Sequence, residues 1–360
     1  DLHYPLRRQR QMCIRDRNVF KKPIENLSRT FVKHPFVPAS IKEFDSRAQE
    51  ILNIQSTGLA RRMISANTEK LIIGLSGGLD STLAFLVCLE TLKSQAVEQK
   101  NLIAVTLPGP GTSEHTLQSV RELTESVDVK VREIKIHTAV EQHLRDIEHS
   151  GNTDTVFENA QARERTQVLF NLANQEAGIV VGTGDLSELA LGWCTFNADH
   201  MSNYNVNVSV PKTMIIYLVE WYAKHKASKN LALALKRVID TPISPELIPP
   251  EKGQIQQKTE EVIGPYELHD FFIYHFLRNG SSPTKIFHLA KLAYKEKYSQ
   301  KEIQKWLKLF FERFFSQQFK RTTLPPGPKI GSVSLSPRGD WRMPDEASAT
   351  IYTKEIEALV

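Results

Sequence analysis

Two hydroxyl groups, two adjacent glycines and one carboxylate are grouped together in the stretch LIIGLSGGLDSTLAF. Gly77 and Gly78 would let an anion approach the main-chain N–H groups closely, and the hydroxyls of Ser76 and Ser81 can donate hydrogen bonds to it. Asp80 can bind a metal ion that bridges phosphate oxygens. Apolar residues precede this group and a helix-prone run follows it, which is typical of a buried strand that enters a helix. The pattern therefore predicts a cradle for phosphate groups.

Gly-Gly pairs are common in tight turns, so a purely structural turn is the alternative interpretation. The hydroxyls and the carboxylate favour the phosphate site. The motif G-x-x-x-x-G-K-[ST] is absent, so ATPase and GTPase mechanisms that rely on its lysine lose their main support. The motif G-x-G-x-x-G is absent as well, which argues against hydride transfer to a dinucleotide.

A second group of polar residues lies in GTGDLSELALGW, at the end of a later apolar run. Glu188 follows Asp185 by one helical turn, and Mg²⁺ in proteins often has one or two carboxylate ligands besides phosphate oxygens and water. The alternative is a capping box, with Asp185 as the N-cap and Glu188 as its partner. Because Asp80 lies in a phosphate loop, we favour a metal shared by Asp80 and Glu188.

The elements that position these residues alternate along the chain. Apolar runs predict strands at 71–75, 101–109, 131–136 and 178–185, and amphipathic segments between them predict helices. Strands separated by helices are typical of a doubly wound parallel sheet, so we expect an α/β fold with additional C-terminal helices.

The flanking segments follow from the same patterns. A helix is predicted at 41–64, and a mainly helical region with proline-rich breaks begins at about Thr213. The segment 322–341 is interpreted as an ordered or ligand-covering loop. We expect a disordered or partly artefactual tail over 1–35 and one domain over 36–360, with a nucleotide-binding core at about 66–250 and a helical part at about 251–360.

Composition excludes several classes of protein. Apolar residues make up 41% of the chain and charged residues 24%, as in ordinary globular proteins. No segment has the ~18 consecutive apolar residues of a membrane span, and the net charge of +5 is too diffuse to indicate nucleic-acid binding. Cys13, Cys88 and Cys194 are far apart, which argues against a disulfide framework and is compatible with a cytoplasmic location.

The loop S-G-G-x-D-S resembles the pyrophosphate loop of the N-type ATP pyrophosphatases, which split ATP between the α and β phosphates. Together with FENAQARERT, GTGDLSELALGW, YNVNVSVPKT, FKR…PPGPK and LSPRGDWR, it resembles NAD synthetase. The similarity is closest to the synthetase portion of the long, glutamine-dependent bacterial form. It extends from about Phe36 to the last residue and implies an adenine nucleotide alpha hydrolase-like, Rossmann-like fold.

The resemblance implies a ligase that uses ATP and Mg²⁺ to convert deamido-NAD to NAD through an adenylated intermediate, releasing AMP and pyrophosphate. It also implies a homodimer, because the dinucleotide site of the family spans two subunits. The long form carries a glutaminase domain ahead of the synthetase, and only its last residues could fit before Phe36. We therefore expect ammonia to support turnover of this chain and glutamine not to.

The resemblance also assigns roles to individual residues. The implied ATP contacts are Ser76, Gly77, Gly78, Asp80, Ser81, Thr183, Lys212 and Ser244. The implied deamido-NAD contacts are Asn159, Arg163, Glu188, Trp193, Cys194, Thr195, Phe196 and Lys320. Mg²⁺ is assigned to Asp80 and Glu188, and the catalytic groups are assigned to Asp80, Lys212 and Lys320.

Some alternatives stay open. Short family members have Lys-Ala-Arg where this chain has Gln161-Ala162-Arg163, and His-Lys where it has Phe319-Lys320. The substrate contacts could therefore differ. Arg163 could belong to a solvated helix face, Lys320 to the charged surface and Trp193 to a core. The alternative functions are a GMP-synthetase-like amidotransferase, a tRNA-modifying enzyme and a non-catalytic nucleotide-binding module.

Overall fold

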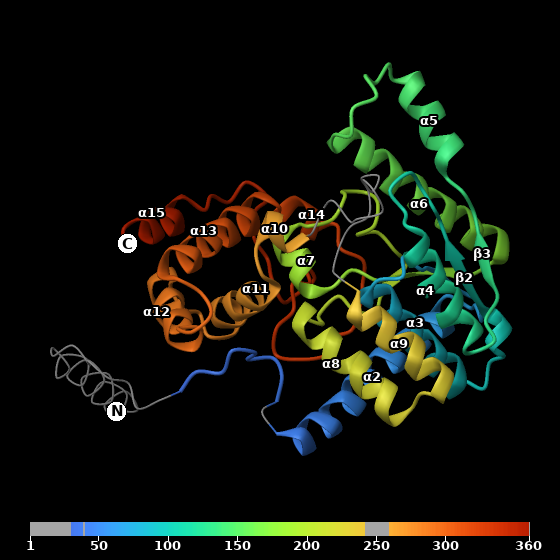
Figure 1. Ribbon diagram of the computed structural model, residues 1–360, viewed down its shortest axis with the longest axis horizontal. Coiled ribbons are helices and arrows are strands. Elements are labelled where there is room, and N and C mark those ends of the chain that lie inside the picture. The colour runs from blue at the N-terminus through green and yellow to red at the C-terminus, as the bar shows by residue number, and fades with distance from the viewer. Residues whose placement is uncertain (1–29, 39, 242–258, 360) are drawn as a thin grey trace, which may run out of the picture. The chain divides into compact units, whose positions relative to one another are not determined.

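The computed structural model describes residues 30–38, 40–241 and 259–359 (Figure 1). Contacts between residues group the chain from Lys33 onward into one compact unit. The predicted tail up to residue 29 and the predicted ATP contact Ser244 lie outside the described residues. Among the described helices, none is both long enough and apolar enough to cross a membrane.

The secondary structure alternates between strands and helices up to residue 205 and is helical beyond it, apart from long connecting segments. The strands are β1 (Leu71–Gly74), β2 (Leu102–Thr106), β3 (Val131–Glu133), β4 (Ile179–Gly182) and β5 (Tyr204–Asn205). The helices up to residue 240 are α2 (Ile41–Ser65), α3 (Leu79–Ser94), the 3₁₀ helix η1 (Gln99–Asn101), α4 (Glu114–Glu125), α5 (His137–Asp146), α6 (Thr155–Glu176), α7 (Leu186–Leu191), α8 (Lys212–His225) and α9 (Lys229–Asp240). The later helices are α10 (Thr259–Ile263), α11 (Tyr266–Ile273), the π-helix η2 (Tyr274–Arg278), α12 (Pro283–Ala293), α13 (Gln300–Ser316), α14 (Gln318–Thr322) and α15 (Thr350–Glu357).

The five strands form one sheet in the order β3-β2-β1-β4-β5, and every neighbouring pair is parallel. Leu71 of the central strand β1 lies opposite Leu102 of β2 and Ile179 of β4. The predicted doubly wound α/β fold is thus confirmed. Since parallel strands end at the same edge of a sheet, the turns that follow β1 and β4 are neighbours there.

Alternate side chains of β1 lie on opposite faces of the sheet, as the period of a strand requires. Leu71 and Ile73 belong to the larger apolar core, which α2, α3, α4, α8 and α9 cover. Ile72 belongs to the core on the other face, which α5 and α6 cover. The helices on both faces hold the sheet between two apolar layers and leave its carboxyl edge for polar residues.

The later helices form an aromatic group of their own, in which α12, α13 and α15 contact one another (Figure 1). Phe310, Phe311 and Phe314 of α13 are fully buried, and the ring of Phe276 packs edge-on against all three. Helix α11 joins this group to the remainder of the unit, because it packs against α7 and α8 as well as α13. This contact places C-terminal residues beside the carboxyl edge of the sheet.

The segment 323–349 has no regular secondary structure but is held against the edge strand β5. Asn205 N donates to Pro326 O at 2.8 Å, and Ser209 Oγ donates to Pro328 O at 2.6 Å. A Cβ atom on Gly327 would lie 2.1 Å from Asn205 O, so only glycine permits this approach. The segment thereby fixes the residues that follow β5.

Candidate active site

The phosphate loop leaves β1 and enters α3 with a geometry that requires glycine. Gly77 has φ +74, and a Cβ atom there would lie 2.9 Å from Thr116 O, which belongs to the main chain of α4. Gly78 is the N-cap of α3 and has no side chain that could cap the first turn. The first main-chain N–H groups of a helix have no intrahelical acceptor, so this end of α3 is suited to an anionic ligand.

The two predicted hydroxyl donors of the loop lie side by side. Ser76 Oγ and Ser81 Oγ are 3.1 Å apart, and Ser81 Oγ also donates to Gly78 O at 3.1 Å. Gly78 N in turn donates to Ser76 Oγ at 3.3 Å. Without a ligand, these hydroxyls therefore stabilise the turn itself.

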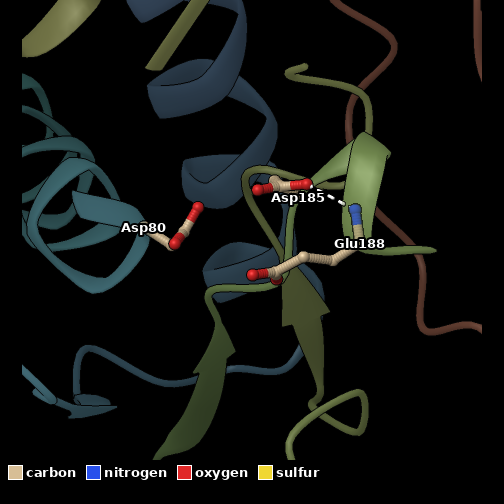
Figure 2. A group of neighbouring side chains, drawn as sticks. All are labelled: Asp80, Asp185 and Glu188. Carbon is tan, nitrogen blue, oxygen red and sulfur yellow. Dashed lines mark hydrogen bonds between the residues drawn. The ribbon is translucent and has the colours of Figure 1, made fainter. Parts of the chain in front are cut away.

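Three carboxylates converge at the carboxyl edge of the sheet (Figure 2). One oxygen from each of Asp80, Asp185 and Glu188 lies within 4.8 Å of the others. Asp80 belongs to the first turn of α3, whereas Asp185 and Glu188 stand at the start of α7. Asp185 Oδ1 also accepts a hydrogen bond from Glu188 N at 2.8 Å, so Asp185 is the N-cap of α7. The cap and the carboxylate cluster therefore coexist, and the sequence analysis missed Asp185 as a member of the cluster.

Lys212 places its ammonium group among the three carboxylates. Its Nζ lies 2.6 Å from Asp80 Oδ2, 2.7 Å from Asp185 Oδ2 and 2.9 Å from Glu188 Oε1. The Lys212 side chain is only 1% exposed. One ammonium group cannot neutralise three ionised carboxylates, so the centre can accept a further cation when all three ionise.

Burial and mutual repulsion make these carboxyl groups hard to ionise. Burial raises the pKa of Glu188 to about 7, the nearby Asp80 carboxylate adds to the rise, and the Lys212 ammonium opposes it. Burial likewise raises the pKa of Asp185, again against the effect of Lys212. Burial alone would lower the pKa of Lys212, but the three carboxylates together raise it well above its usual value. Lys212 therefore stays charged.

The donor set fits Mg²⁺. Asp80 Oδ1 is buried and has no hydrogen-bond partner among the described residues. The Asp80 and Glu188 side chains remain 22% and 21% exposed, so a ligand can reach them. Carboxylate oxygens are the ligands that Mg²⁺ prefers, usually with water and phosphate oxygens completing its shell. Asp80, Asp185 and Glu188 would hold the ion.

A buried amide, Asn207, ties the two carboxylate-bearing turns together. Asn207 Nδ2 donates to Asp80 O at 2.9 Å and to Thr183 O at 3.1 Å. Its own Oδ1 accepts from Gln55 Nε2 of α2 at 3.0 Å. The predicted ATP contact Thr183 therefore lies beside Asp80, with its main-chain oxygen in this network. Nothing local in YNVNVSVPKT pointed to the role of Asn207.

Helix α11 fixes the start of α8, where Lys212 lies. Both Thr213 N and Thr213 Oγ1 donate to Asp270 Oδ2, at 2.9 Å and 2.6 Å. Ser187 Oγ donates to the other oxygen of Asp270 and accepts from Lys212 N at 2.9 Å. Asp270 is fully buried and stands far from Lys212 in sequence, so sequence reasoning missed it as well.

The far end of α7 binds cations through its carbonyl groups. Lys320 Nζ donates to Gly192 O at 2.8 Å and to Cys194 O at 2.7 Å. Arg321, which is 0% exposed, donates to Ala190 O at 2.9 Å and to Leu189 O at 3.2 Å. Arg313 Nε donates to Leu191 O at 2.8 Å. The surface-charge alternative is thus wrong for Lys320, which is half-buried.

The predicted dinucleotide contacts lie in the segment that follows α7 and on α6. Thr195 Oγ1 donates to Asn159 Oδ1 at 2.9 Å, so the structure brings these two predicted residues together. Phe196 is exposed and packs against the ring of Phe319. Trp193 is half-buried and lies against the Arg313 guanidinium, consistent with a partial core role. Arg163 is exposed on α6.

Comparisons with known proteins identify the family of this chain. The sequence model of the NAD synthase family matches residues 51–321. Glutamine-dependent NAD(+) synthetase of Mycobacterium leprae is 39% identical over 94% of this chain and 54% of its own length. The enzyme of the same name from Mycobacterium tuberculosis is 40% identical over 93% of this chain and 53% of its own length. The chain thus spans about half the length of these relatives.

Solved structures show the same fold. A glutamine-dependent NAD(+) synthetase from Cytophaga hutchinsonii has a TM-score of 0.69 at 18% identity, covering 87% of this chain and 56% of that one. The Acinetobacter baumannii enzyme, solved with adenosine diphosphate, has a TM-score of 0.50 at 21% identity, covering 86% of this chain and 51% of that one. The family model covers most of the chain and spans the phosphate loop, the three carboxylates and Lys212. The chain therefore belongs to the NAD synthase family.

Proposed function

We propose that this chain converts deamido-NAD to NAD, with ATP as the activating substrate and ammonia as the nitrogen donor. Two observations support the proposal: membership of the NAD synthase family and the meeting of a phosphate loop with a carboxylate and lysine centre. The meeting of the phosphate loop with this centre carries the proposal. A carboxylate becomes an electrophile only after activation by ATP, and the phosphate loop is suited to holding the pyrophosphate that leaves.

In the first step, an oxygen of the nicotinate carboxylate attacks the α-phosphorus of ATP. The bond from this phosphorus to the oxygen that bridges to the β-phosphate breaks, and its electron pair leaves with pyrophosphate. The N–H groups at the start of α3 and the hydroxyls of Ser76 and Ser81 stabilise the negative charge that accumulates on pyrophosphate. Lys212 adds a positive charge beside the same phosphates, with Thr183 at the neighbouring turn.

Mg²⁺ held by Asp80, Asp185 and Glu188 would neutralise phosphate charge. The three carboxylates also keep Lys212 protonated, so it can act only as a fixed positive charge and not as a base. Asn207 and Asp270 hold the turns that carry these groups at a set separation. The protein thus positions charge before the reaction begins.

In the second step, ammonia attacks the carbonyl carbon of the acyl-adenylate. The bond from this carbon to the phosphate oxygen breaks, AMP departs, and the nitrogen loses a proton to water to give the amide. We assign Lys320 to this step, since its ammonium group uses two hydrogen bonds on Gly192 O and Cys194 O and retains a third proton for the substrate. Burial lowers the pKa of Lys320, which eases proton exchange at this position.

The dinucleotide would lie along residues 193–196 and α6. Asn159 and Thr195 already share a hydrogen bond, and Phe196 offers an exposed ring for stacking. Because Arg163 points from α6 into solvent, we assign it to deamido-NAD bound by the second subunit of a homodimer. Light scattering on the purified chain measures whether it is a dimer. A fully active monomer would contradict this assignment of Arg163.

The described cysteines do not suit glutamine hydrolysis, which needs a reactive thiolate. Burial raises the pKa of Cys88 and of Cys194 far above the usual thiol value, so both stay protonated at neutral pH. Ammonia for this site would then come from solution or from a glutaminase site outside the described residues. Since most ammonia is protonated at neutral pH, the ammonium concentration needed for half-maximal rate should fall as the pH rises.

The decisive experiment uses deamido-NAD labelled with ¹⁸O in the nicotinate carboxylate, together with ATP, Mg²⁺ and ammonium. We expect equal amounts of NAD, AMP and pyrophosphate, with one label atom transferred to AMP because the carboxylate oxygen stays on phosphorus. Formation of ADP, or AMP without label, would overturn the adenylation mechanism. Turnover with glutamine alone would overturn the ammonia assignment, and activity only with xanthylate or tRNA would favour the alternative enzymes.

A further inference from the structure

Tyr266, the first residue of α11, forms a wall of the carboxylate centre to which no role has yet been given. The centroid of its ring lies 5.2 Å from Lys212 Nζ, and the side chain is only 2% exposed. Its main-chain N donates to Glu260 Oε1 at 2.9 Å, and Pro265 precedes it as the N-cap of α11. The backbone of Tyr266 is thereby held in place beside the ammonium group.

The hydroxyl of Tyr266 is buried and has no hydrogen-bond partner within the described part of the chain. Leaving a buried polar group unpaired costs about 1–3 kcal/mol, and such groups are rare in native proteins. The two other buried tyrosines among the described residues are satisfied: Tyr222 donates to Glu90 Oε1, and Tyr294 donates to two main-chain oxygens. Tyr266 therefore differs from Tyr222 and Tyr294 because its buried hydroxyl has no hydrogen-bond partner among the described residues.

The Tyr266 hydroxyl is available as a hydrogen-bond donor. Burial raises the pKa of Tyr266 well above its usual value, Lys212 opposes this, and Glu188, Asp185 and Asp80 add to it. The hydroxyl consequently stays protonated and can donate. The Tyr266 ring lies beside Lys212, whose ammonium group also contacts Asp80 in the first turn of α3, the helix that the phosphate loop enters.

We propose that the Tyr266 hydroxyl donates a hydrogen bond to a phosphate oxygen of the bound nucleotide, so that α11 forms one side of the ATP site. A nucleotide bound at the phosphate loop and Lys212 would place a phosphate oxygen near Tyr266, where it can accept this hydrogen bond. The inference rests on the proposed function only in taking ATP to bind here, and its test measures binding apart from turnover.

Tyr266→Phe removes the hydroxyl and leaves the ring. Because the hydroxyl has no partner among the residues that the structure describes, we expect the ligand-free melting temperature to stay the same or rise. The Kd for Mg·ATP, measured by calorimetry, should weaken about tenfold, since hydrogen bonds to charged groups are among the stronger ones. The Kd for adenosine should not change, because adenosine carries no phosphate.

Tyr222→Phe is the matched control, because Tyr222 lies on α8 with Lys212 but its hydroxyl bonds to Glu90. This variant should show the reverse pattern, a lower melting temperature with an unchanged Kd for Mg·ATP. An unchanged Kd in Tyr266→Phe would overturn the inference, as would an equal loss of adenosine binding. Wild-type protein that binds Mg·ATP but makes no NAD would refute the proposed function and leave this inference standing; wild-type protein that binds no Mg·ATP would refute both.

Discussion

The two ends of α7 differ in how completely their polar groups are paired. At its start, Asp185 and Glu188 share one ammonium group with Asp80, and Asp80 Oδ1 has no hydrogen-bond partner among the described residues. At its other end, the carbonyl groups from Leu189 to Cys194 accept hydrogen bonds from three cationic side chains, those of Arg313, Lys320 and Arg321.

The carboxylates at the start of α7 are thus available to a ligand, whereas the carbonyl groups at its other end serve as anchorage, with Lys320 keeping one N–H for the substrate. Groups left unpaired in the ligand-free protein cost free energy that a ligand can recover, so the start of α7 gains from binding. Saturated carbonyl groups gain nothing from a ligand, and cations at the carboxyl end of a helix are also favourable electrostatically. Helix α7 is therefore anchored at its carboxyl end. This anchorage holds Asp185 and Glu188, at its start, close to Asp80 despite their mutual repulsion.

The sharpest test of the reactive end is Asp80→Asn. The amide keeps the size of the side chain but loses the charge that faces Lys212 and would bind Mg²⁺, so we expect kcat to fall by on the order of 10²-fold or more. Thermal stability should change little, because the variant also relieves repulsion among the carboxylates. NAD formation and melting curves measure the two effects. The control is Glu90→Gln, which replaces a carboxylate by an amide near the other end of α3 and should leave kcat unchanged. If Glu90→Gln lowered kcat as much as Asp80→Asn, the effect could not be attributed to the carboxylate centre.

The anchored end is tested by Arg321→Met, which fills the same space without the guanidinium. The carbonyl groups of Leu189 and Ala190 would be left buried and unpaired, so the free energy of unfolding should fall by about 2 kcal/mol, as urea titration can measure. Arg132→Met, which removes an exposed ion pair with Glu176, should cost well under about 1 kcal/mol. If Arg321→Met kept its stability and lost kcat, the roles assigned to the two ends would be reversed.

The pH dependence of stability gives the smallest and most specific test. The folded pKa of Glu188, about 7, lies above its ordinary value of 4.5, so the folded protein without metal binds more protons than the unfolded chain between these values. The free energy of unfolding should therefore decrease as the pH rises from about 4.5 to about 7, and the raised pKa of Asp185 acts in the same direction. Arg321, with a pKa of about 9, keeps its charge throughout this window.

Urea titrations in the presence of a chelator, from about pH 5 to about pH 8, measure this slope, and Glu188→Gln should flatten it. Added Mg²⁺ should stabilise the protein more at the upper end of the range, because the ion binds ionised carboxylates. A slope of the same size in Glu188→Gln would show that another group accounts for the pH dependence.

Local patterns predicted the elements that carry the site. Apolar runs predicted the strands β1 and β4, and the glycines, hydroxyls and carboxylate after the first run predicted the phosphate loop. In the structure Gly77 has a positive φ and Gly78 is the N-cap of α3. Asp80, Glu188 and Lys212 do meet in the structure, as their predicted roles require. These features depend on residues close together in sequence, or on the known geometry of parallel strands.

The supporting residues could not be predicted in this way. Asp270 reaches Thr213 across 57 positions, Asn207 reaches Asp80 across 127, and Arg321 reaches Ala190 across 131. Each looks ordinary in its own segment, because an aspartate, an asparagine or an arginine in a polar stretch is usually exposed. Only the folded chain shows that these polar side chains are buried and paired.

The docking of residues 326–330 beside β5 has a consequence for synthesis on the ribosome. A nascent chain that ends just beyond Lys212 already contains all three carboxylates and their lysine, but neither α11 nor the Pro326 and Pro328 carbonyls that hold Asn205 and Ser209. Contacts between segments so far apart form late, after most of the chain has left the exit tunnel. The carboxylate centre therefore gains these supporting contacts only after residues up to about 330 have been synthesised.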